Sequence, residues 1–182
     1  MAEDDLRWET LDTQTAYSCP GFDVVTDAVR LPDGTEEKYD YLTEPPAVVV
    51  LPFTPEGDVV VIEEWRQAVD RVNRGLPVGG VEPEDESLAA AAHRELREET
   101  GHEADSVRHM TTVEPANGIA DSVLNVFVAE GCRPTAEQDL DHNESIRVDR
   151  TTFGELKTAV EADEVRDART VLAVLYYALG EA

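Results

Sequence analysis

The sequence predicts an α/β (α+β) fold in which a few helices cover a mixed sheet. Short strand-like segments separated by turn signals fill the first part of the chain, and a strongly apolar hairpin follows them. After the hairpin comes an alanine-rich segment of helical composition, and two more helical segments close the chain. Strands mixed with a few helices around one apolar core indicate a sandwich of helices and sheet.

The N-terminal part of the chain is expected to form antiparallel strands over residues 8–17, 22–31 and 37–42. Pro32, Asp33 and Gly34 are typical turn residues between the second and third of these segments. Consecutive prolines at 45 and 46 then interrupt the chain. We therefore divide the sequence into an N-terminal strand element, residues 1–43, and a main domain, residues 44–182.

The main domain begins with a hairpin whose strands, residues 47–53 and 58–65, flank the turn sequence Pro55, Glu56 and Gly57. A glycine- and proline-rich loop over residues 75–83 leads to a helix over residues 86–100. Gly101 stands where a helix commonly ends in a glycine. Further strands are expected at 106–114, 122–130 and 144–150, and further helices at 153–162 and 168–179.

Charge is the most unusual property of the composition. The chain has 40 acidic residues against 15 lysines and arginines, which gives a formal net charge of −25. Such a chain repels a nucleic-acid backbone, so DNA or RNA binding is excluded as a function class. The pattern resembles proteins of a high-salt cytoplasm, where dense counterions screen self-repulsion. We expect a halophilic protein that folds only in molar salt.

The chain shows no sign of a membrane or secreted protein. Its longest apolar run, residues 47–53, is far too short to span a bilayer. The N-terminus is acidic and lacks the basic and apolar parts of a secretion signal. The two cysteines, Cys19 and Cys132, belong to no metal or redox spacing and are expected to be reduced. We expect a cytoplasmic protein that binds no membrane.

The helix predicted at 86–100 carries three glutamates on neighbouring positions. Glu95, Glu98 and Glu99 share one arc of the helix, because residues three and four apart lie side by side. Their mutual repulsion would be reversed by a divalent cation, and carboxylate oxygens suit Mg²⁺ or Mn²⁺. In so acidic a chain, helical periodicity alone leaves a second interpretation open, namely a solvated helix face.

The loop before this helix favours the metal-site interpretation. It contains the adjacent glycines Gly79 and Gly80, whose backbone can adopt conformations closed to other residues and can approach an ion closely. A loop that leads into a helix can also present N–H groups to a phosphate. A metal-binding face beside such a loop is suited to water attack on phosphorus.

The spacing of residues 80–101 resembles the Nudix box. Gly80 is followed by five residues and Glu86, and after seven more residues the chain reads RELREETG from Arg94 to Gly101. Every fixed position of the box, from the first glycine to the last, is matched. One position departs, because His102 stands where the family usually has an aliphatic residue, and we expect it to be a surface or packing residue.

The resemblance implies the Nudix α/β/α sandwich, with the box as loop, helix and loop. It implies a Mg²⁺ site, in which Mn²⁺ can substitute. Arg94 would orient the glutamates through a salt bridge. The residues that the resemblance implies for the metal are Glu95, Glu99, Glu98, the carbonyl of Gly79 and, in a supporting role, Glu86.

Beyond the box, four stretches are similar to the ADP-ribose pyrophosphatase branch of the family. In that branch the N-terminal strands help to form a homodimer, so residues 1–43 are expected to be a dimerisation element. Departures from the branch occur at Gly75, Asn117 and Ser122. The four stretches are residues 64–67, 76–80, 118–121 and 141–144.

The resemblance also implies substrate contacts. Trp8 and Trp65 would stack on adenine, with packing in the core or the dimer interface as the alternative for each ring. Arg66 would bind a phosphate, with a surface salt bridge as its alternative. Gly118 lies in a loop expected near the substrate. Glu144 would accept the proton from the attacking water or bind a further metal ion.

We therefore predict a Mg²⁺-dependent enzyme that hydrolyses ADP-ribose to AMP and ribose 5-phosphate, with Glu98, Glu144 and Arg94 as the residues at the reaction centre. One alternative is a Nudix hydrolase of another nucleotide sugar, a dinucleotide or a damaged nucleoside triphosphate. A second alternative is a non-catalytic Nudix domain that senses a nucleotide, although the box glutamates are all present.

Overall fold

The computed structural model describes residues 6–180 and divides into two compact units. The smaller unit contains residues 6–45 together with 114–123, and the larger contains residues 46–113 and 124–180. Segment 114–123 thus groups with the N-terminal strands, although in the sequence it lies between two strands of the larger unit. Each unit is described by itself below.

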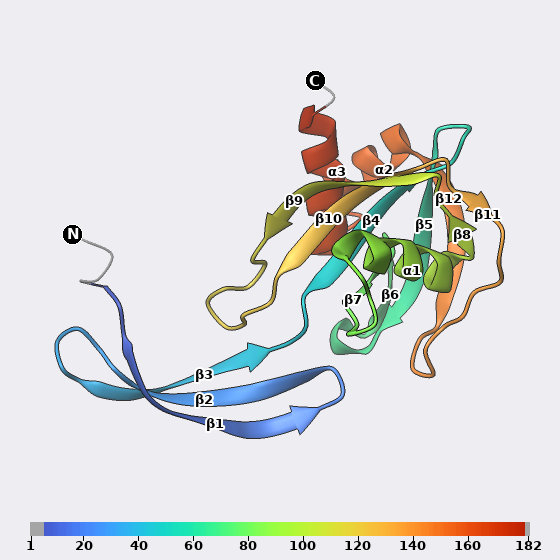
Figure 1. Ribbon diagram of the computed structural model, residues 1–182. Helices are drawn as coiled ribbons and strands as arrows, with labels where there is room; N and C mark the ends of the chain where they lie inside the picture. Colours follow the sequence, from blue (N-terminus) through green and yellow to red (C-terminus); the bar gives the residue numbers. More distant parts are fainter. Residues whose placement is uncertain (1–5, 181–182) are drawn as a thin grey trace. The chain divides into compact units, whose positions relative to one another are not determined.

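The smaller unit is a three-stranded antiparallel sheet, drawn in blue in Figure 1. Its strands are β1 (Glu9–Cys19), β2 (Phe22–Arg30) and β3 (Glu36–Thr43), which confirms the strands predicted there. The turn between β2 and β3 contains Gly34 at φ +88°, a conformation that favours glycine. Segment 114–123 is held to β3 by the backbone of Leu42, which donates to Ile119 and accepts from Asp121.

The larger unit is built on a mixed sheet of order β12-β5-β4-β10-β9, with β6 paired to β5 and β7 to β4. Strands β4 and β10 are parallel, and the other pairs are antiparallel. The strands are β4 (Ala47–Phe53), β5 (Asp58–Arg66), β6 (Arg71–Gly75), β7 (Val78–Gly80), β9 (Ser106–Val113), β10 (Leu124–Glu130) and β12 (Ile146–Thr152), with a small separate pair β8 (His102–Glu103) and β11 (Arg133–Pro134).

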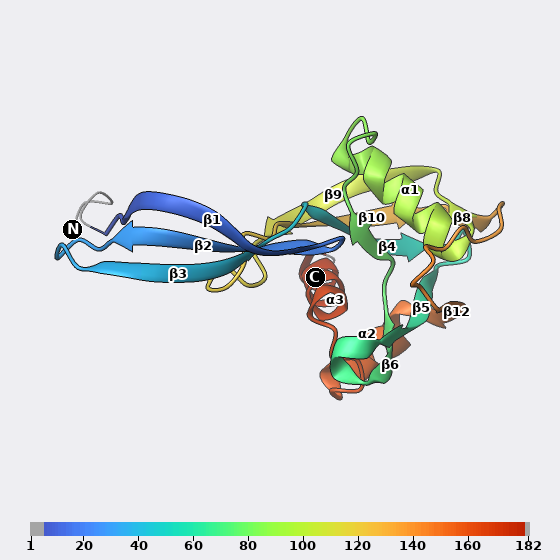
Figure 2. The same cartoon turned by 90° about the horizontal axis from the view of Figure 1, so that it is seen from below.

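Helices cover both faces of this sheet. Helix α1 (Leu88–Thr100) lies on one face, and α2 (Phe153–Glu161) and α3 (Ala168–Gly180) lie on the other (Figures 1 and 2). Alternate residues of β4 serve the two cores, since side chains of a strand point to opposite faces in turn. Val48 and Val50 pack in the α1 core, and Val49 and Leu51 in the α2–α3 core. The predicted α/β/α sandwich with a mixed sheet is confirmed.

Two local predictions were wrong. The segment predicted as a loop over residues 75–83 contains the short strand β7 and follows β6, because pairing with β4 and β5 orders a glycine- and proline-rich stretch of weak intrinsic preference. Helix α1 begins at Leu88, not at residue 86, because the side chain of Ser87 accepts a hydrogen bond from the Ala90 N–H and caps the helix. Within residues 6–180, no helix has the length and apolar character needed to cross a membrane.

Candidate active site

Helix α1 is fixed at both ends and along its apolar face. Ala91, Ala92 and Leu96 are buried against the sheet. At its end Gly101 adopts φ +68° and donates its N–H to Arg97 O, the left-handed ending that favours glycine. A Cβ at Gly101 would also lie 2.4 Å from Ala136 O, so no larger residue fits there. The helix therefore presents its polar arc in a defined orientation.

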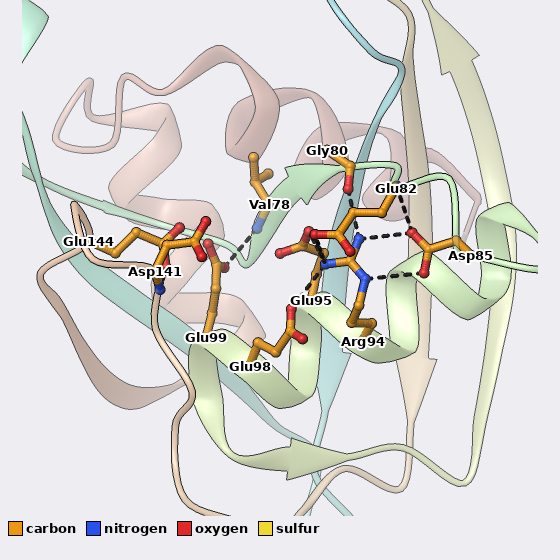
Figure 3. A network of polar contacts seen from close by, with 10 residues as sticks. All are labelled: Val78, Gly80, Glu82, Asp85, Arg94, Glu95, Glu98, Glu99, Asp141 and Glu144. Carbon is orange, nitrogen blue, oxygen red and sulfur yellow. Dashed lines mark hydrogen bonds and ion pairs between the residues drawn. The ribbon is translucent and has the colours of Figure 1, made fainter. Parts of the chain in front are cut away.

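Glu95 and Glu99 point from this arc toward the short strand β7 (Figure 3). Both are buried, with 8% and 2% of their surface exposed. A Cβ built on Gly79 would lie 2.1 Å from the Glu95 carboxyl carbon. Only glycine at position 79 allows the β7 backbone to lie this close to the Glu95 carboxylate.

Burial dominates the electrostatics of the two acids. It raises the pKa of Glu95 to about 7, against the lowering effect of the neighbouring Arg94. It raises the pKa of Glu99 to about 9, although Oε2 of Glu99 accepts a hydrogen bond from the Val78 N–H at 2.9 Å. Both carboxyls therefore lie where their ionised forms need additional positive charge.

Arg94 connects the loop before the helix to the glutamates, as Figure 3 shows. Its Nη1 lies 2.8 Å from Glu95 Oε1 and 2.9 Å from Glu98 Oε2. On the other edge, Nε and Nη2 donate to the two oxygens of Asp85, and Nη2 also donates to Gly80 O at 2.8 Å. The guanidinium is thus held between the loop and the helix, in the position expected of a residue that orients the glutamates.

Asp85 is a residue of this network that the sequence argument missed. Only 6% of its side chain is exposed, and the Arg94 hydrogen bond lowers its pKa. Glu86, which the resemblance implied near the metal, is exposed and has no hydrogen bond or ion pair to any part of the chain that the structure describes. Both Asp85 and Glu86 precede helix α1, and sequence spacing alone does not indicate which of the two contacts Arg94.

The acidic loop that carries Glu144 is attached to the C-terminal end of α1. The backbone N–H groups of Thr135 and Ala136 donate to Gly101 O, and that of Asp139 donates to Glu98 O. The side chain of Gln138 donates to Glu99 O at 2.6 Å. These contacts use carbonyls that the helix end leaves without partners. The loop is therefore positioned by the helix that carries the glutamates.

Glu144 lies beside Glu99 at the end of this loop (Figure 3). Its Oε2 accepts a hydrogen bond from the Asp141 N–H at 3.0 Å. Its charge contributes to the raised pKa of both Glu95 and Glu99. The structure thus brings Glu144, remote in sequence, to the same site as the helix glutamates.

The end of β5 holds two of the predicted substrate-binding residues. Trp65 is 45% exposed, and its Nε1 donates to Gln67 Oε1 at 3.0 Å. Nη2 of Arg66 lies 2.6 Å from Oε2 of the buried Glu64 in an ion pair that is not aligned as a hydrogen bond. Burial raises the pKa of Glu64, and the charge of Glu144 adds to this effect.

The other two predicted substrate-binding residues belong to the smaller unit. Trp8 is 43% exposed, and its ring meets that of Tyr39 edge-on with centroids 5.8 Å apart. The Tyr39 hydroxyl donates to Gly118 O at 2.7 Å. Trp8 and Gly118 are therefore linked through Tyr39 within this unit.

His102 is a buried packing residue, with 4% of its surface exposed. Nδ1 lies 2.9 Å from Thr100 O and Nε2 lies 3.4 Å from Nη2 of Arg150 on β12. Because Arg150 can only donate, the arrangement favours the neutral tautomer with its proton on Nδ1. Burial lowers the pKa of His102, and Arg150 lowers it further.

The donors around Glu95 and Glu99 fit a hard divalent cation. All are oxygens, two belong to buried carboxylates, and the missing Cβ of Gly79 lets the Glu95 carboxylate lie against the β7 backbone. As the side chains stand, no three acidic, histidine or cysteine groups among residues 6–180 are close enough together to hold an ion. Glu95 and Glu99 would have to turn from Arg94 and Val78 to share one.

A comparison with protein families agrees with this geometry. The NUDIX domain matches residues 43–174, which is most of the chain. The chain belongs to the Nudix family. Its box begins at Gly80 at the end of β7, continues through α1 and ends at Gly101.

The chain is also similar to individual proteins inside this family. The chain is 33% identical over 178 residues to an ADP-ribose pyrophosphatase of Bacillus subtilis (strain 168), covering 97% of this chain and 96% of that protein. It is 29% identical over 175 residues to a methanol dehydrogenase activator of Bacillus methanolicus, covering 96% and 94%. A solved structure of an ADP compounds hydrolase has the same fold, with a TM-score of 0.83, 22% identity and coverage of 96% and 94%.

Proposed function

We propose that this Nudix protein hydrolyses the pyrophosphate bond of ADP-ribose, with Mg²⁺, to AMP and ribose 5-phosphate. The observation that carries the proposal is the placement of the buried Glu95 against Gly79 and of the buried Glu99 against the Val78 N–H, with Arg94 hydrogen-bonded to Glu95. The similarity to an ADP-ribose pyrophosphatase over nearly the whole of both chains supports the substrate.

Mg²⁺ would be held by Glu95, Glu98 and Glu99 together with the carbonyl of Gly79. When bound, the ion activates water and neutralises the charge that develops on the diphosphate. Mn²⁺ would take the same oxygens. The burial that raises the pKa of Glu95 and Glu99 is then offset by the ion, so both carboxylates can remain ionised at neutral pH. Glu86, which is exposed in this structure, would support the metal site or its waters.

Arg94 and Glu144 would support the reaction from either side of these carboxylates. Arg94 would keep Glu95 and Glu98 oriented, a role supported by the hydrogen bonds that its Nη1 donates to both. Glu144 accepts the proton of the attacking water at its carboxylate, with the Asp141 N–H holding one of its oxygens. The attachment of its loop to α1 supports this role, because the same helix carries the glutamates.

The substrate would be held by residues outside the box. Arg66 is partly exposed beside Glu64 and is suited to a phosphate oxygen. Trp65 and Trp8 each expose more than a third of their surface, which a stacked adenine could cover. Gly118 accepts a hydrogen bond from the hydroxyl of Tyr39, whose ring contacts that of Trp8.

The smaller unit is proposed to form a homodimer interface. A three-stranded sheet is marginal unless a face is covered. Every residue of β1 before Cys19 is exposed, and only Val25 and Val29 of this sheet are buried apolar residues. Light scattering of the full chain would give twice the mass of 20.0 kDa if the interface forms. A monomeric mass under the conditions of activity would contradict it.

The first experiment is to incubate the purified chain with ADP-ribose and Mg²⁺ in molar KCl and to measure AMP. Glu98→Gln should nearly abolish AMP release, and Glu144→Gln should lower kcat with little change in KM. Glu161→Gln on α2 is a matched acidic control, because Glu161 is exposed and far along the chain from the box. A folded protein that releases no AMP would exclude this substrate, and a panel of nucleotide sugars and dinucleotides would follow.

A further inference from the structure

A shallow polar pocket lies in the larger unit between the end of β5 and the start of α3. It has about 210 Å³ of empty space, part of it open to solvent. Because the pocket is partly open to solvent, it could enclose only one end of a nucleotide substrate. Its polar lining consists of Glu64, Arg66, Asn73, Asp167 and Arg169.

Two acid–arginine pairs of the same construction form the walls of the pocket. Glu64 holds Arg66 at 2.6 Å, and Asp167 holds Arg169 at 2.9 Å. The acid side chains are 9% and 13% exposed, whereas the arginine side chains are 33% and 30% exposed. Each guanidinium has five N–H donors, and the contact with its acid uses one edge only. The remaining donors are available to a ligand in the pocket.

The local charge differs from that of the rest of the chain. Residues 66–75 contain three arginines and a single acid, Asp70, in a protein whose formal net charge is −25. The helix α3 also begins at this pocket, and Asp167 accepts from the Thr170 N–H at its first turn. The two acids of the lining are matched by its two arginines, so an anion meets less repulsion here than the net charge of the chain implies.

Glu64 adds a hydrogen-bond acceptor to the pocket, which a ligand without a hydroxyl group would not use. Its Oε2 is buried and has no hydrogen-bond partner among the described residues, although the atom lies in the ion pair with Arg66. A buried carboxylate oxygen without a hydrogen bond requires an explanation, and a ligand hydroxyl would supply the donor. Arginine donors next to such an acceptor suit a sugar that carries a phosphate.

The pocket also borders the proposed reaction centre. Gly75 and Leu76 line the pocket, and two residues after Leu76 the Val78 N–H donates to Glu99 Oε2. A group bound at Arg66 and Arg169 would therefore lie near the proposed metal site. Leu76, which lines the pocket, donates its N–H to Thr170 Oγ1 and so ties the start of α3 to the segment that leads to Gly79.

We propose that this pocket binds the phosphoribosyl end of the substrate, the part released as a sugar phosphate. Arg66 and Arg169 hold its phosphate, and Glu64 accepts a hydrogen bond from a ribose hydroxyl. The inference rests on the proposed function for the identity of the substrate. It goes further by assigning one half of that substrate to named residues outside the Nudix box.

Binding of ribose 5-phosphate to the full chain, measured by calorimetry with Mg²⁺ in molar KCl, tests the pocket. Arg169→Gln should weaken ribose 5-phosphate at least tenfold and leave AMP binding within about twofold, since charge-assisted hydrogen bonds contribute roughly 1.5–3 kcal/mol. Arg166→Gln removes the same charge from an exposed neighbour outside the pocket and should change neither. Glu64→Gln should weaken ribose 5-phosphate but not inorganic phosphate.

Several results would overturn the inference. These are no ribose 5-phosphate binding to the wild type, equal losses in Arg166→Gln and Arg169→Gln, or an Arg169 dependence confined to AMP. If Arg169→Gln does not fold, Arg169→Lys keeps the charge and should still lose affinity, because an ammonium cannot bind bidentately. Turnover is not needed. Arg169-dependent binding without ADP-ribose hydrolysis would reject the proposed function alone, and hydrolysis with unaffected ribose 5-phosphate binding would reject the pocket alone.

Discussion

Asp85 accepts two hydrogen bonds from Arg94, from Nε at 3.1 Å and from Nη2 at 2.9 Å. We expect Asp85→Asn to lower kcat roughly tenfold, because a charge-assisted contact contributes roughly 1.5–3 kcal/mol and Arg94 would lose its hold on Glu95 and Glu98. Glu84→Gln, on an exposed neighbour, is the control. Steady-state kinetics with ADP-ribose measures both. A harmless Asp85→Asn beside a damaging Glu86→Gln would show that Glu86 supports the site instead.

The two adjacent glycines of the box should respond very differently to alanine. In Gly79→Ala the new methyl group would lie 2.1 Å from the Glu95 carboxyl carbon, so the carboxylate must move and activity should fall at least a hundredfold. In Gly80→Ala the methyl group meets nothing within 4 Å, and the loss should be much smaller. Activity and thermal melts of both variants check this. Similar losses in the two would contradict it.

Gln138 is expected to position the loop of Glu144. Gln138→Ala removes the hydrogen bond to Glu99 O, whose net contribution is about 1 kcal/mol, so kcat should fall roughly threefold to tenfold. Hydrogen exchange of residues 135–145 should become faster in this variant, a change that a general loss of stability would not confine to the loop. Glu137→Ala, on the exposed neighbour, serves as the control. Unchanged exchange in Gln138→Ala would argue against the role.

His102 should make the protein less stable in acid. Burial lowers its pKa in the folded state below the ordinary histidine value of 6.5, so the unfolded chain takes up the proton first as the pH falls. The stability it contributes is present above pH 6.5 and is lost as the pH falls through the lowered pKa. Thermal melts between pH 8 and pH 5 should show a smaller loss of Tm in His102→Leu than in the wild type. A larger loss of Tm in His102→Leu than in the wild type would contradict the prediction that His102 destabilises the protein in acid.

Salt should stabilise the fold strongly. With a formal net charge of −25, self-repulsion opposes the compact state, and at 1 M salt the Debye length falls to about 3 Å. We propose a high-salt cytoplasm as the setting of this chain and expect Tm to rise by ten degrees or more between 0.1 M and 3 M KCl. Measuring Tm in the same concentrations of a neutral osmolyte separates the screening of charge repulsion from the general effect of solutes excluded from the protein surface. Equal Tm values at low and high KCl would refute halophilic adaptation.

Much of the site was predictable because it lies on one helix. Helical periodicity places Glu95, Glu98 and Glu99 on one arc regardless of the rest of the fold, and the structure has them there. The start of α1 differs by two residues, since a capping serine can act only where the chain geometry permits. The alternation along β4 was equally local, and its apolar run indicated burial on both faces.

Other parts of the site depend on contacts that spacing does not encode. Asp85 and Glu86 are equivalent by composition, and only the turn of the loop decides which of them meets Arg94. Gln138 reaches Glu99 O from a segment with no regular structure. Composition does not distinguish Glu64 from the other acids of the chain, because its surroundings are set by residues of β6 and by those at the start of α3.

The parallel pairing of β4 with β10 has a consequence for how the protein is made. Ala47 and Leu124 become neighbours although residues 48–123 separate them in the sequence. During synthesis, the apolar strand β4 leaves the ribosome well before β10, and one of its edges stays unpaired in that interval. Long-range pairing of this kind slows folding. The nascent chain is therefore most prone to aggregate before residue 130 has emerged.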